Sequence, residues 1–175
     1  MKKTLILMSL LGLSIAGLLV NLNSTRVHAQ EIKGKGYLSQ LADLMNTVMQ
    51  VHHTKLWFAG HANNWALAAY EVRKIKEAIE EIKETIIEIQ ALSPQWRIVS
   101  LGEILKNFDS NLDSLDQAVK AKNELKFNAS YRELTDTCNA CHMSAGQSQI
   151  KIIEPVLNGG GTFSDQDFTT DTGRQ

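Results

Sequence analysis

Cysteine and proline are both scarce in this chain of 175 residues, which contains two of each. The cysteines lie three positions apart, so a zinc site would need further cysteines or a well-spaced pair of histidines that the sequence does not supply. Pro94 and Pro155 leave the stretch 31–93 free of proline. Because proline breaks helices, this stretch has room for long ones.

Basic residues form no stripe or cluster along the chain, and the formal net charge is −1. Without Lys2, Lys3 and Arg26 the chain keeps 15 basic residues against 19 acidic ones, a charge of −4. Nucleic acid carries dense negative charge and is bound by basic surfaces. The composition therefore argues against a nucleic-acid partner.

The first 29 residues have the order of a secretory signal peptide. Lys2 and Lys3 precede an apolar run over 5–20, a polar segment follows, and Val27-His28-Ala29 offers small residues at a cleavage site. No cysteine that could carry a lipid lies near this cleavage site, so a lipoprotein is not expected. The sequence predicts cleavage after Ala29 and a periplasmic or secreted protein. The alternative is an uncleaved membrane anchor, since the run is close to the shortest that spans a bilayer.

The two cysteines stand in the pentapeptide Cys138-Asn139-Ala140-Cys141-His142. A C-x-x-C-H motif is the attachment site of haem c, in which both thiols bond to the porphyrin and the histidine binds the iron. A redox dithiol, a structural disulfide or half of a zinc site would use similar spacing. A thioredoxin-type dithiol, however, needs a βαβ pattern, which is missing. The motif predicts one haem c on Cys138 and Cys141, with His142 as the proximal ligand.

Apolar residues recur at three- and four-residue steps over four segments, the pattern of amphipathic helices. We expect helices over about 37–59, from about 64 to 92, over 98–122 and over 124–145. Gly60 and Gly146 are expected stops, and Asn63, Asn64 and Asn123 are expected caps. Four such helices with short connections predict an all-α, antiparallel four-helix bundle.

The predicted apolar stripes define the expected core. They comprise Leu38, Leu41, Met45, Val48, Met49, His52 and Leu56; Trp65, Ala68, Val72, Ile75, Ile79, Ile82, Ile86 and Ile89; Ile98, Leu101, Leu105, Phe108, Leu112, Leu115 and Val119; and Leu125, Phe127, Tyr131, Leu134, Cys138, Cys141 and His142. We expect Trp57, Phe58, Trp65 and Tyr70 to close one end of the bundle, and His61 to be exposed.

The predicted organisation has three parts. Residues 1–29 form the signal peptide, 30–147 the four-helix-bundle cytochrome domain, and 148–175 a C-terminal extension that packs in part and ends in a disordered tail.

With its signal, its bundle pattern and a haem motif late in the last helix, the chain resembles the class II c-type cytochromes, the cytochrome c-prime group of bacterial periplasmic proteins. The resemblance covers about 31–146. In class I cytochromes the motif comes near the start instead. The segments 55–60 (KLWFAG) and 64–71 (NWALAAYE) are also similar to uncharacterised secreted proteins of this architecture. The resemblance implies thioether links at Cys138 and Cys141 and iron ligation by His142.

The chain departs from the class II pattern in two places. Family members usually end soon after the motif, whereas 33 residues follow His142 here. The family often has a basic residue in or beside the motif, where this chain has Asn139 and Ala140. Members are often dimers through their first two helices, so a homodimer is one expected state.

The sixth iron ligand is expected on the first helix, which offers Met45, Met49, His52 and His53. We expect His53 to be this ligand ahead of Met49 and Met45. A histidine or methionine there gives a low-spin iron suited to electron transfer. An apolar residue would leave the site open to small gases.

Three functions follow from these expectations. The first is an electron carrier with periplasmic redox partners, and no membrane contact unless the signal stays uncleaved. The alternative is a five-coordinate haem protein that binds or scavenges gases such as nitric oxide. A weak peroxidase or a redox subunit ranks last, because no distal acid–base pair is evident. The protein is accordingly expected not to be an enzyme.

Overall fold

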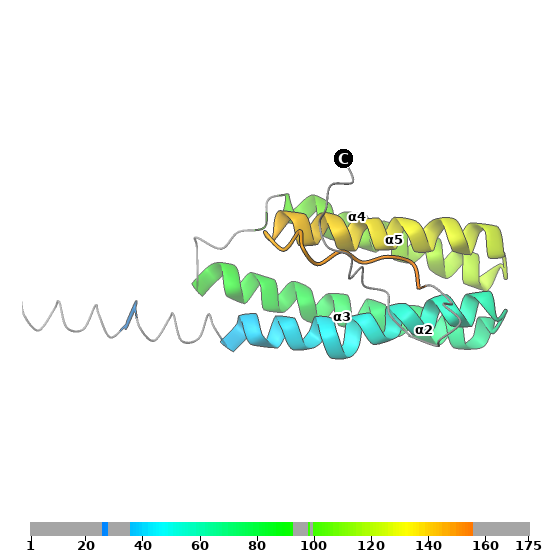
Figure 1. Ribbon diagram of the computed structural model, residues 1–175, viewed down its shortest axis with the longest axis horizontal. Coiled ribbons are helices and arrows are strands. Elements are labelled where there is room, and N and C mark those ends of the chain that lie inside the picture. Colours follow the sequence, from blue (N-terminus) through cyan, green and yellow to red (C-terminus); the bar gives the residue numbers. More distant parts are fainter. Residues whose placement is uncertain (1–25, 28–35, 93–97, 99, 156–175) are drawn as a thin grey trace, which may run out of the picture.

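The computed structural model describes residues 26–27, 36–92, 98 and 100–155. Four helices pack in sequential antiparallel pairs, as Figure 1 shows: the first helix lies beside α3, and α4 lies beside α5. The first helix is helical from residue 36, contains the π-helix η1 (Leu44–Met49) and continues as α2 (Gln50–His61). It is followed by α3 (Trp65–Leu92), α4 (Leu101–Lys120) and α5 (Glu124–Ser144). The all-α, four-helix prediction is confirmed.

The predicted signal peptide falls almost wholly outside the described residues, as does the chain beyond Pro155. In the part that the structure describes, none of the helices has the length and apolar character needed to cross a bilayer.

The predicted helix ends are close to the observed ones, and their chemistry explains them. Asn123 Oδ1 accepts a hydrogen bond from Lys126 N at 3.0 Å and caps α5, and Asn64 Oδ1 accepts one from Leu67 N at 3.2 Å ahead of α3. Gly146, with φ of +72°, ends α5 in a left-handed turn that carries the two hydrogen bonds of a Schellman motif. The helix predicted from residue 98 begins at Leu101 instead, after Ser100 at φ of +59°.

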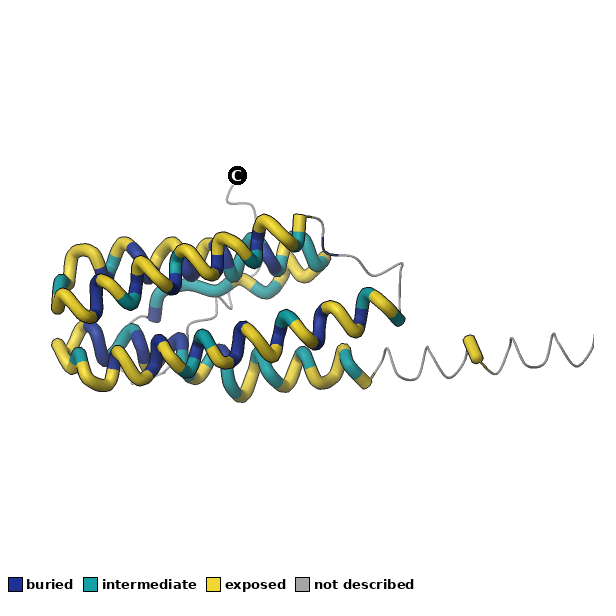
Figure 2. The backbone as a smooth tube through the Cα atoms, turned by 180° about the vertical axis from the view of Figure 1, so that it is seen from behind, coloured by how far each residue is buried: buried dark blue, intermediate teal, exposed yellow. Residues whose placement is uncertain are grey.

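One buried apolar cluster runs between the helices. In Figure 2 the buried residues, coloured dark blue, lie mainly on the sides of the helices that face one another. All the predicted stripe positions of α3 except the half-buried Trp65 are buried. Fully burying one valine or isoleucine side chain of this stripe stabilises the fold by about 1.5–3 kcal/mol. Two stripe positions were predicted wrongly: Leu125 is 84% exposed in the first turn of α5, and Leu38 is 38% exposed. Both lie in the first turn of their helices.

Gly60 was expected to stop the first helix, but the helix continues to His61 and the glycine has another role. A Cβ at Gly60 would lie 2.1 Å from Cε1 of Phe127, a ring with no exposed surface. Glycine therefore lets α2 approach α5 more closely than any other residue would allow.

The aromatic end of the bundle forms around Phe127. Its ring meets the rings of Trp65 and His61 edge-on, with centroids 6.0 Å and 6.2 Å away. The ring of Trp57 stacks on that of His61 at a centroid distance of 3.9 Å. His61 is exposed as predicted. Tyr70 was expected in this cluster but is 45% exposed, and its ring lies under Arg73 instead.

Replacing Gly60 by alanine should lower the free energy of unfolding by about 1–3 kcal/mol, the usual cost of overpacking a core. Urea denaturation of the purified chain would measure this loss. Gly102→Ala is the matched control, because a Cβ on that helical glycine meets nothing within 4 Å. It should leave stability unchanged or raise it by up to about 1 kcal/mol. Equal losses in both variants would contradict the close approach of α2 to α5.

Candidate functional site

The C-x-x-C-H motif lies in the last two turns of α5, where the helix borders the core. Cys141 is buried and belongs to the apolar cluster, whereas Cys138 is half-buried and packs against it. Both cysteines are present as thiols. Burial raises the pKa of the Cys141 thiol above its ordinary value. A reactive redox cysteine has a lowered pKa, so this thiol has the opposite character.

His142 is half-buried, and its ring is held by the chain that follows α5. Its Nδ1 lies 2.8 Å from the carbonyl oxygen of Ile150. A carbonyl only accepts, so Nδ1 carries the proton and donates it, which leaves the lone pair on Nε2. Burial lowers the pKa of this imidazole. Burial, the larger effect, favours the neutral ring, whereas the hydrogen bond to Ile150 O acts to raise the pKa. In the neutral ring that hydrogen bond selects the Nδ1–H tautomer, which leaves Nε2 as the donor atom that ligation of a metal requires.

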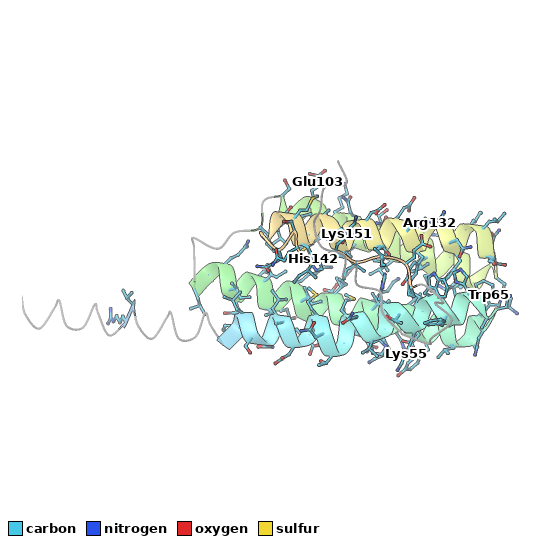
Figure 3. All side chains as sticks on the ribbon, viewed as in Figure 1. Lys55, Trp65, Glu103, Arg132, His142 and Lys151 are labelled. Atoms are coloured by element: carbon cyan, nitrogen blue, oxygen red, sulfur yellow. The ribbon has the colours of Figure 1, made fainter. Side chains whose placement is uncertain are left out.

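The turn at Gly146 brings Ile150 to His142. Gln147 N donates to His142 O at 2.8 Å and Gly146 N donates to Met143 O at 3.1 Å, so the chain reverses directly after the motif. The segment 147–155 then runs back along α5, and Figure 1 shows it in orange beside that helix. Figure 3 labels Lys151 of this segment and His142 of the motif. We call residues 147–155 the return segment.

Asn139 fastens the return segment to the motif. Its Nδ2 donates to Ile152 O and its Oδ1 accepts from Ile152 N, both at 2.8 Å. Two helical turns before Asn139, on the same face of α5, Arg132 Nε lies 2.6 Å from Glu154 Oε1. The two departures from the class II pattern, the residue at 139 and the chain beyond the motif, are therefore bonded to each other.

His53 lies deep between α2 and α5, 2% exposed, and hydrogen bonds engage both of its ring nitrogens. Nε2 lies 3.0 Å from Thr135 Oγ1 and Nδ1 lies 2.9 Å from the Tyr131 hydroxyl, whose ring stacks on the imidazole at 4.5 Å. Thr135 Oγ1 donates onward to Tyr131 O at 2.9 Å. With its proton used there, the threonine accepts from Nε2–H, and the one proton of the Tyr131 hydroxyl is shared between Nδ1 and His53 O, which lies 3.0 Å away. Ligation of iron by either nitrogen would break one of these bonds.

The other candidates on the first helix lie in different surroundings. His52 Nδ1 lies 2.6 Å from Oε2 of Glu71, a buried carboxylate of α3, so its ring is directed to α3. Met49 is 7% exposed and belongs to the same apolar cluster as Cys141, and Met45 is half-buried against that cluster. Both methionines lie in η1, where the Gln50 N–H reaches back five residues to Met45 O.

The contacts between the two helices define their register. Gly60 lies against Phe127, and His53 lies against Thr135. The two helices are antiparallel, so each residue nearer the start of the first helix lies level with a residue nearer the end of α5. By this register Met49 is level with 138–139 and Met45 with 142–143. His53 is level with Thr135, about 10 Å along the helix axis from His142 at 1.5 Å per residue.

No group of three or more His, Cys, Asp or Glu side chains within the described residues is arranged to hold a metal ion. A zinc ion needs about four such ligands, so half a zinc site at Cys138 and Cys141 finds no second half there. A depression of about 410 Å³ over α3 and α4 is lined largely by charged side chains, among them Lys76, Glu80 and Asp113. It contains no residue of the motif.

Comparisons with protein-family models, with curated proteins and with solved structures found no match.

Tyr131→Phe should lower the free energy of unfolding by about 1–3 kcal/mol, because it removes a buried hydroxyl bonded to His53 Nδ1 and to His53 O at 3.0 Å. Urea denaturation of the purified chain would measure the change. Tyr70→Phe alters an exposed hydroxyl and should stay within about 0.5 kcal/mol of the parent. A Tyr131 variant as stable as the parent would mean that this network contributes nothing.

Proposed function

We propose that this protein is an exported c-type cytochrome that carries one haem and transfers electrons between periplasmic redox partners. The observation that carries the proposal is the motif on α5: two thiols at the edge of the core, followed by a half-buried imidazole with a donating Nδ1. These residues fit a covalently attached haem. Cys138 and Cys141 would hold it through thioether bonds, and Nε2 of His142 would bind the iron, which supplies the one-electron redox change.

The alternatives for the motif have less support. A thioredoxin-type dithiol would need a βαβ unit, whereas the elements of the described residues are all helices. A zinc site would need further ligands, which the described residues do not supply around the motif. Haem c needs from the protein only two thiols and one imidazole at this point of the chain, and the motif has these.

Electron transfer is favoured over gas binding by the register of the first helix. The two methionines of η1 are level with the motif, and thioether sulfur is a good sixth ligand for haem iron. Among the three distal candidates the geometry supports Met49 or Met45 over His53, whose ring nitrogens are bonded to Thr135 and Tyr131. With two axial protein ligands the iron would be low-spin and closed to gases.

The protein part of the proposed mechanism is to hold the iron in one environment in both redox states. The apolar cluster around Cys141 and Met49 excludes water from one side of the group. The Nδ1–H bond to Ile150 O fixes the imidazole plane.

Replacing both Cys138 and Cys141 with alanine should abolish covalent haem when the chain is exported together with a haem c maturation system. Mass spectrometry of the purified protein would detect the added mass of one haem in the parent and its loss in the variant. The same spectrum tests export, since the mature chain should begin at Gln30. A parent chain that carries no haem under these conditions would overturn the proposal.

The absorption spectrum of the ferrous protein with carbon monoxide should separate the carrier from the gas binder. We expect a low-spin spectrum that carbon monoxide leaves unchanged. In Met49→Ala or Met45→Ala the weak methionine-to-iron band should disappear from the ferric spectrum, and carbon monoxide should bind. His53→Gln is the comparison: it should lower stability and keep the parent spectrum. A high-spin parent spectrum that shifts with carbon monoxide would favour the gas-binding alternative, and a spectral change only in the His53 variant would assign the ligand to His53.

A further inference from the structure

The return segment has a structure that a bundle cytochrome does not need for its fold. It leaves the last turn of α5 through Gly146 and is bonded at three points to one side of that helix. Two of these points lie within the motif itself: Ile150 O meets His142, and Ile152 meets Asn139 with both its N–H and its C=O. The third, the exposed ion pair of Arg132 and Glu154, adds little to stability.

The two bonds between Asn139 and Ile152 determine where the carbonyl of Ile150 lies. The carboxamide matches the N–H and C=O of one residue, which fixes the backbone both laterally and in rotation. Ile152 is half-buried, Pro155 beyond it is buried, and Ile150 is only two residues before it. The tight turn at Gly146 fixes the other end of the same short stretch. Between these two fixed ends the Ile150 carbonyl has little freedom to move from Nδ1 of His142.

We propose that the return segment positions His142, holding its imidazole as the Nδ1–H tautomer through Ile150 O and thereby lowering the reduction potential of the iron. Asn139 acts as a positioning residue through the return segment. The effect on the iron rests on the proposed haem, whereas the effect on the tautomer does not. The physical reason is that an N–H···O=C bond at Nδ1 draws the proton away from the ring and makes the lone pair of Nε2 a stronger electron-pair donor to the iron. A stronger donor stabilises ferric iron relative to ferrous iron.

The first experiment reads the His142 tautomer by ¹⁵N NMR of the imidazole nitrogens in the full, haem-free chain at a pH where the ring is neutral. The parent should show a protonated Nδ1 and an unprotonated Nε2. Asn139→Ala should shift the ring toward the Nε2–H form. Asn111→Ala is the matched control, because Asn111 of α4 also makes two hydrogen bonds to α5, to Glu133 O and Thr137 Oγ1, and none is recorded to the return segment. It should keep the parent tautomer. Identical tautomers in all three proteins would overturn the proposal, whether or not the chain carries haem.

The second experiment measures the reduction potential of the haem-loaded chain by spectroscopic titration. Asn139→Ala should shift the ferric-to-ferrous equilibrium about tenfold toward the ferrous form, which corresponds to about 59 mV. Asn111→Ala should leave it unchanged. Gly146→Ala tests the same segment without altering the motif: a Cβ there meets nothing within 4 Å, but the φ of +72° is strained for alanine. It should raise the potential in the same direction by a smaller amount.

These results separate the two proposals. A tautomer that responds to Asn139 in a chain that never takes up haem supports the positioning role and overturns the proposed function. A haem-loaded chain whose potential is the same in the Asn139, Gly146 and Asn111 variants overturns the effect on the iron. A potential that moves equally in the Asn139 and Asn111 variants would mean that general loosening of α5, and not the return segment, is responsible.

Discussion

The close approach of α2 to α5 is the contact on which the rest of this structure depends. Sequential antiparallel pairing brings α3 against the first helix and α5 against α4, but it does not by itself determine how one pair sits on the other. At one end of the bundle Gly60 admits the ring of Phe127 into the surface of α2. One to two turns away His53 is bonded to Thr135 and Tyr131. Because packed helices are rigid, these two contacts determine the register along their whole length.

The consequence reaches the other end of α5. The register that Phe127 and Thr135 establish carries the motif past the level of His53 and toward η1. There the first helix presents methionines, which are polarizable and adapt to irregular space. The π-helix, in which bonds reach back five residues, alters which side chains face inward compared with a regular helix. Thr47 Oγ1 donates to Asp43 O at 2.7 Å in the same stretch, a back-bond of the kind that bends helices.

The helices themselves could be predicted from the sequence because their cause is local. The isoleucines of α3 recur with the helical period and are buried as expected, and Asn64, Asn123 and Gly146 act through hydrogen bonds within one turn of themselves. The errors have a common cause. Leu38 and Leu125 fit the period but are exposed in the first turns of their helices, and Tyr70 follows the aromatic segment but lies on the outer face of α3. Burial depends on the neighbour as well as on the pattern.

The sequence by itself determined the helical segments and most of their ends, and it contains the motif of Cys138, Cys141 and His142 on which the proposed haem rests, because spacing and residue type are properties of a short stretch. Only the tertiary structure decided that Gly60 serves a close approach and that His53 is bonded on both nitrogens. It also decided that Asn139 and Ile152, thirteen positions apart, pair across the turn. Each of these depends on where a distant part of the chain comes to lie, and that position results from the packing of all four helices together.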